Sequence, residues 1–117
     1  MARPILVVDD DALMQRLIHL ALTKAGYDVV MAENGALGLE VARTHDPLLI
    51  LLDRGMPVTN GWEFLRIYCA SPGPHAPVIV CSVLRPTSLA FPCRVGFLSK
   101  PFHIGQLLDS VRRQLPP

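Results

Sequence analysis

The stretch LLILLDRGMP, residues 48–57, determines how the rest of the chain is interpreted. Its five consecutive aliphatic residues have neither helical nor alternating periodicity. They predict a strand buried on both faces, which the following Gly and Pro bring to an end. Asp53 therefore stands at the carboxyl end of a strand, and in open α/β sheets this is the edge where ligands bind. Taken alone, Asp53 also fits an aspartate that forms a turn.

The composition predicts a single compact domain over residues 1–117. Half of the residues are hydrophobic, and 117 residues suffice for one core but not for two. The net charge is +1 and no run of Lys or Arg is present, so we expect no direct contact with nucleic acid or with a membrane. No apolar run is long enough to span a bilayer, and residues 1–10 lack the layout of a signal peptide. We therefore expect a cytoplasmic protein.

The three cysteines, Cys69, Cys81 and Cys93, are odd in number and form no C-x-x-C pair. This pattern argues against both a disulfide framework and a zinc site. We expect all three to be small core or loop residues. The four histidines also lack the spacing of metal ligands.

Strand and helix patterns alternate along the chain. Apart from the central run, short apolar segments predict strands at 5–8, 27–32, 77–82 and 94–99. Apolar residues at helical spacing and capping residues predict helices at 12–25, 34–45, 60–70 and from 103 onward. Pro86 and Pro92 leave little room for a helix before the last strand, so the fourth helix is expected to be short or missing. Right-handed crossovers then give an α/β fold with a five-stranded, doubly wound parallel sheet.

Polar residues are expected to converge at the carboxyl edge of this sheet. Asp9 and Asp10 follow the first strand, Asp53 ends the third, and Ser82 and Lys100 stand at the ends of the fourth and fifth. Clustered carboxylates repel one another near neutral pH, which favours a bound divalent cation. Carboxylates, a backbone carbonyl and water are the ligands of Mg²⁺. A carboxylate beside that metal can accept a phosphoryl group, with a lysine and a hydroxyl meeting its oxygens.

Four motifs in this order resemble the receiver domain of two-component response regulators, and they cover essentially the whole chain. They are ILVVDDD (5–11), LLILLDRGMPVTNGWEFL (48–65), PVIVCS (77–82) and FLSKPF (97–102). The resemblance implies a flavodoxin-like (βα)5 fold with strand order 2-1-3-4-5. It also implies that Asp53 is phosphorylated from the phosphohistidine of a histidine kinase or histidine phosphotransfer protein. The chain would then be a phosphoacceptor in a phosphorelay, promoting its own reaction and signalling to a downstream protein target or a detached effector domain.

The resemblance also assigns the metal ligands. Asp10 and Asp53 would bind Mg²⁺ directly, Asp9 through water, and Gly55 through its backbone carbonyl. Asp11 is better interpreted as the cap of the following helix. A capped and solvated loop is the simpler reading of the Asp triplet.

The remaining site roles fall on the last two strands. Ser82 corresponds to the switch hydroxyl of the family, Phe97 to the switch aromatic and Lys100 to the lysine that pairs with the phosphate. The Lys100-Pro101 bond is expected to be cis. The simpler readings are a strand-end serine, a core phenylalanine and a lysine that extends from a strand end to solvent.

Two departures from the family pattern leave a rival open. Arg54 replaces a usual apolar residue beside Asp53, and Val83 replaces the small residue usual after the switch hydroxyl. A pseudo-receiver, which keeps the fold as a binding module without phosphorylation, is therefore the alternative. A haloacid-dehalogenase-like phosphatase would need a second Asp at the position of Gly55, so that reading is poor.

Overall fold

The computed structural model describes residues 3–53, 61–82 and 93–115. Five parallel strands form one sheet in the order β2-β1-β3-β4-β5, which confirms the predicted flavodoxin-like topology. The strands are β1 (Ile5–Val8), β2 (Val29–Ala32), β3 (Leu49–Asp53), β4 (Val78–Ser82) and β5 (Val95–Ser99). The helices of the described ranges are α1 (Ala12–Lys24), α2 (Gly35–His45), α3 (Gly61–Ala70) and α4 (Ile104–Gln114). The expectation of a short or missing helix around Pro86 and Pro92 concerns residues outside these ranges.

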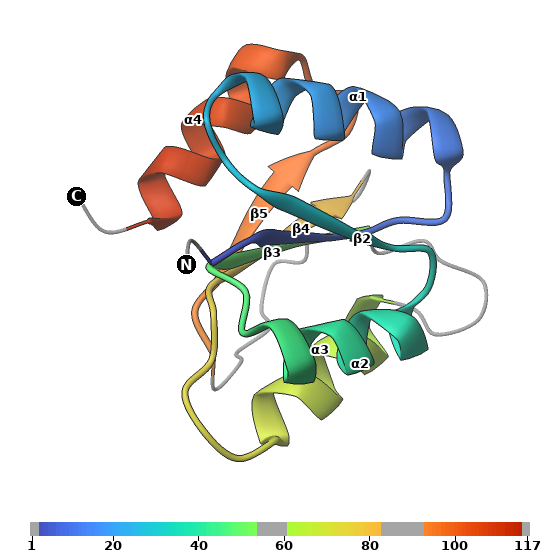
Figure 1. The fold of residues 1–117 in the computed structure, drawn as a ribbon, viewed down its shortest axis with the longest axis vertical. Helices are drawn as coiled ribbons and strands as arrows, with labels where there is room; N and C mark the ends of the chain where they lie inside the picture. The colour runs from blue at the N-terminus through green and yellow to red at the C-terminus, as the bar shows by residue number, and fades with distance from the viewer. Residues whose placement is uncertain (1–2, 54–60, 83–92, 116–117) are drawn as a thin grey trace.

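The helices cover both faces of the sheet. Helices α1 and α4 lie on one face, and α2 and α3 lie on the other (Figure 1). Every residue of β1, β3 and β4 is buried. Alternate residues along these strands face opposite layers: Leu6 and Val8 pack on the α2/α3 side, whereas Ile5 and Val7 pack on the α1/α4 side. The long apolar run around residue 50 is thus a strand with two covered faces, as predicted.

Strand β2 begins two residues later than the sequence predicts. Tyr27 completes the end of α1 instead, because its backbone N–H donates to the carbonyl of Leu22 at 3.0 Å. Gly26 between them has φ of 98°, the left-handed conformation that terminates many helices. The helix end therefore uses the backbone donor that a strand at residue 27 would need.

The prediction for two of the three cysteines is wrong. A disulfide joins Cys69 to Cys93, while Cys81 is free and buried. The paired residues are 24 positions apart in sequence. Only the packing of the end of α3 beside the approach to β5 brings them together, and spacing along the chain does not reveal this proximity.

Candidate functional site

The three consecutive acids Asp9, Asp10 and Asp11 have different surroundings. Asp11 is the N-cap of α1, and its Oδ1 accepts from the backbone N–H groups of Leu13 at 3.0 Å and Met14 at 3.4 Å. Asp9 is buried, and its Oδ1 accepts from the Asp11 N–H at 2.9 Å. Asp10 is exposed. The triplet is therefore not simply a solvated loop, because one member caps a helix and another is withdrawn from solvent.

Asp53 and Lys100 meet across the carboxyl edge of the sheet. The Lys100 Nζ lies 2.8 Å from the Asp53 Oδ1, and both side chains are largely shielded from solvent. The Lys100 backbone N–H donates to the carbonyl of Ser82 at 2.9 Å, which ties the end of β5 to the end of β4. The Lys100-Pro101 bond is cis, as predicted. Two residues 47 positions apart in sequence thus form one ion pair.

Three carboxylates converge beside that lysine. Asp9, Asp10 and Asp53 each offer a carboxylate oxygen, and these oxygens all lie within 4.8 Å of one another. The Lys100 ammonium offsets one of the three charges, so the fully ionised cluster keeps two negative charges. This oxygen-rich donor set and its residual charge fit a divalent cation of the Mg²⁺ type.

Burial and neighbouring charges also change the ionisation of Asp9 and Lys100. Burial, together with the negative charges of Asp53 and Asp10, raises the pKa of Asp9 to about 6, although the Asp11 N–H and the Lys100 charge act in the opposite direction. For Lys100, burial alone lowers the pKa, but the hydrogen bond and charge of Asp53, together with the charge of Asp9, outweigh burial, so that its pKa is raised. The lysine is therefore held in its charged form beside Asp53.

The two predicted switch residues lie on neighbouring strands. Ser82 is buried at the end of β4, and Phe97 is partly buried in β5, where it packs against the α2/α3 core. Strand register pairs Val80 with Phe97 and Ser82 with Ser99. Both residues thus lie on the adjacent strands β4 and β5, and Lys100 directly follows β5.

Some predicted residues fall outside the described ranges, and one contributor was missed. Gly55, Arg54 and Val83 all lie outside those ranges. The missed residue is Gln15, whose side-chain amide donates to the backbone carbonyl of Asp9. Gln15 lies four residues after the capping Asp11, so its side chain lies on the same face of α1 as the loop that precedes the helix. This spacing is the one signal in the sequence that could have indicated its role.

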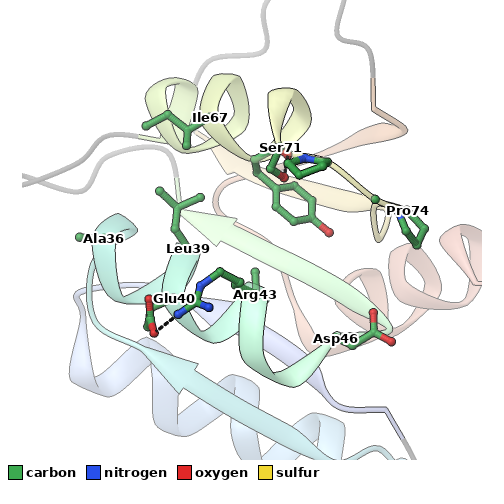
Figure 2. A pocket seen from close by; sticks show the side chains of 12 residues that line it. Ala36, Leu39, Glu40, Arg43, Asp46, Ile67, Ser71 and Pro74 are labelled. Carbon is green, nitrogen blue, oxygen red and sulfur yellow. Dashed lines mark hydrogen bonds and ion pairs between the residues drawn. The ribbon is translucent and has the colours of Figure 1, made fainter.

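The structure also contains a cavity of about 630 Å³ that none of the predicted site residues lines. It lies between α2 and α3, with Leu39 and Arg43 on one helix and Ile67 on the other (Figure 2). Asp46, at the end of α2, also lines the cavity. Its carbonyl accepts a hydrogen bond from Arg3 at 3.1 Å, which shows that Asp46 lies beside the start of β1. The cavity is therefore separate from the acidic cluster.

Comparison with known families agrees with the fold and with the acidic cluster. A family model described as the response regulator receiver domain matches residues 5–112. The chain belongs to this family. Its members are the receivers of two-component systems, signalling phosphoacceptors that bind Mg²⁺ at an acidic pocket and interact with histidine kinases and downstream targets.

The chain covers different fractions of the length of its individual relatives. It is 34% identical to the chemotaxis protein CheY of Bacillus subtilis strain 168 over 120 residues, covering 98% of this chain and 99% of that protein. It is also 34% identical to the probable transcriptional regulatory protein SilR of Salmonella typhimurium, but covers only 50% of it. The chain thus spans nearly all of the first relative and half of the second.

A solved structure supports the same assignment. The chemotaxis response regulator CheY4 of Vibrio cholerae superposes with a TM-score of 0.83 at 26% identity, covering 98% of this receiver and 100% of that chain. In the described part of the receiver, no helix combines the length and apolar character that crossing a lipid bilayer requires.

Proposed function

We propose that this receiver accepts a phosphoryl group on Asp53 from the phosphohistidine of a histidine kinase or a histidine phosphotransfer protein. The observation that carries the proposal is the Asp53–Lys100 ion pair at 2.8 Å, with Asp9 and Asp10 supplying the two neighbouring carboxylates. An Asp53 oxygen attacks phosphorus, the bond from phosphorus to the histidine nitrogen breaks, and the imidazole leaves as a neutral ring that keeps the proton already on its other nitrogen. Asp53 then carries an acyl phosphate.

In this proposal Asp10 and Asp53 would bind Mg²⁺ directly and Asp9 through water, and Gly55 would contribute its backbone carbonyl. When bound, the ion neutralises charge on the phosphoryl oxygens during transfer. Lys100, held charged beside Asp53, pairs with another of those oxygens once Asp53 is modified. Ser82 supplies a hydroxyl at the same edge.

The proposed output runs through β4 and β5. Ser82 moves toward the phosphoryl group and Phe97 turns inward, which alters the surface presented to a protein target or an effector domain. We propose that residues 1–117 act as one receiver domain in the cytoplasm, without contacting nucleic acid or a membrane directly. Relatives such as SilR, of which the receiver matches only half, support the idea that some receivers are parts of longer regulators.

The decisive experiment is intact mass spectrometry after incubation with Mg²⁺ and acetyl phosphate. We expect one added phosphoryl group on the parent and none on Asp53→Asn. Asp109→Asn is the matched control, because Asp109 is an exposed acid that pairs with Arg112 on α4, and it should react like the parent. An unmodified parent would instead favour the pseudo-receiver, and a modified Asp53→Asn would move the acceptor to another residue.

A further inference from the structure

The disulfide stands apart from the acidic cluster, at the opposite edge of the sheet. Cys69 lies in the last turn of α3, and Cys93 lies two residues before β5. Their Cα atoms are 5.5 Å apart, which is within the ordinary range for a disulfide. The third cysteine, Cys81, is buried in β4 and has no part in the bond.

The two cysteine residues differ in their exposure. The Cys69 residue is 7% exposed and belongs to the α2/α3 core. Cys93 is partly exposed and packs against the outside of the same core. Of the two residues, Cys93 is therefore the more accessible to a reagent from solvent.

We propose that Cys69 and Cys93 form a redox modification site, a pair of thiols that a hydroperoxide oxidises and a small dithiol reduces. The Cys93 thiolate attacks a peroxide oxygen, the O–O bond breaks, and a sulfenic acid and water or an alcohol form. The Cys69 sulfur then attacks the Cys93 sulfur, the S–O bond breaks, and the departing hydroxide takes the Cys69 proton as water. Two electrons pass from the sulfurs to the peroxide, and the dithiol returns them in the reverse direction.

Compartment favours a reversible pair over a permanent crosslink. Disulfides in a reducing cytoplasm are typically transient and redox-sensing. The cytoplasmic setting, and with it this step, rests on the proposed function as a target of a histidine kinase. The chemistry of the thiol pair itself can be tested without that function.

The bond also bears on the strand that leads to the acidic cluster. Strand β5 lies at the edge of the sheet with β4 as its sheet neighbour, and its first three residues are only partly buried. The disulfide ties the approach to this strand to α3, and the same strand carries Phe97 and ends beside Lys100. Reduction should therefore loosen the start of β5. Oxidation at Cys93 would then affect the start of this strand, and phosphorylation of Asp53 would affect its end beside Lys100.

The first test counts thiols on the full chain, without Mg²⁺ or phosphodonor. Protein treated with hydrogen peroxide or with dithiothreitol is denatured, alkylated with N-ethylmaleimide and weighed. We expect one adduct after peroxide and three after dithiothreitol, since the chain has three cysteines. The matched control Cys81→Ala should give none and two. Three adducts on the peroxide-treated parent would overturn the proposal.

The order of reaction has its own test. The sulfenic acid is trapped with dimedone in the two single variants after brief peroxide treatment. Cys69→Ser, which keeps the accessible Cys93, should be labelled more strongly than Cys93→Ser. Equal labelling, or the reverse order, would contradict the assignment of Cys93 as the first sulfur to react.

The last test measures the effect on β5 by hydrogen exchange. Amides of residues 95–99 should exchange at least about tenfold faster after reduction, while those of α1 stay unchanged. The melting temperature should fall by about 10 °C on reduction, and Cys69→Ser should match the reduced parent. Identical exchange in both redox states would overturn the structural role. Because the change from the oxidised to the reduced state should be the same in Asp53→Asn as in the parent, a failure of these tests is distinguishable from a failure of phosphorylation.

Discussion

At the carboxyl edge of the sheet, an ion pair and clustered carboxylates form the main side-chain contacts, whereas at the amino edge, where the end of α3 meets the approaches to β4 and β5, uncharged contacts do so. Asp53 and Lys100 form an ion pair beside further carboxylates that repel one another. At the other edge, the backbone N–H of Ala76 donates to the Tyr68 hydroxyl at 2.7 Å, and Cys93 is bonded to α3. The first arrangement is electrostatically incomplete without a cation, and the second is complete as it stands. The difference separates the edge suited to binding a metal ion and a phosphoryl group from the edge where uncharged contacts and a disulfide join α3 to the sheet.

The largest expected effect comes from removing one acid at the carboxyl edge. Asp10→Ala should weaken Mg²⁺ binding by about 100-fold or more, because a direct carboxylate ligand is lost. The metal-free variant should be as stable as the parent or more stable, since one member of a repelling cluster is gone. Melting curves with and without Mg²⁺ measure both effects. A less stable variant that still responds to the metal would break the comparison.

A substitution at the amino edge should act with the opposite sign on stability. Tyr68→Phe leaves the N–H of buried Ala76 without its acceptor, which should lower the free energy of unfolding by about 1–3 kcal/mol. Urea unfolding measures the loss, and Tyr27→Phe is the matched control at the chain's other tyrosine. A loss no larger than that of the control would show that the hydroxyl contributes little.

A third substitution separates the two roles within the Asp triplet. Asp11→Ala removes the N-cap of α1 and should cost about 1 kcal/mol of stability. Its Mg²⁺ affinity should stay within a few-fold of the parent, unlike that of Asp10→Ala. Calorimetric titration with Mg²⁺ and urea unfolding of the same sample give both values. A large loss of metal affinity would place Asp11 among the ligands.

The smallest expected effect is a displaced titration at the amino edge. Burial raises the pKa of Tyr68 above the ordinary value of about 10, and it outweighs the N–H of Ala76, which favours the phenolate. The unfolded chain therefore loses this proton first, so the free energy of unfolding should fall as pH rises through about 10. Ultraviolet titration of Tyr27→Phe, in which Tyr68 is the only tyrosine, measures the pKa. Ionisation at or below about 10 would contradict the shift.

The residues at the carboxyl edge were predictable to different degrees. A parallel sheet collects the carboxyl ends of its strands at one edge, so the meeting of Asp9, Asp53 and Lys100 follows from recognising where each strand ends. Asp11 was equally predictable, because an N-cap depends only on the first turn of its own helix. The burial of Asp9 was not, since it depends on how the loop after β1 folds back on α1.

The sequence by itself determined the α/β class, the strand ends and the carboxylate cluster, because these follow from local periodicity and from one rule of parallel sheets. Only the tertiary structure decided that Cys69 meets Cys93 and that Tyr68 reaches Ala76. Those contacts depend on the distance between the end of α3 and the starts of β4 and β5. Helix tilt and loop path set that distance, and neither leaves a periodic signal in the chain.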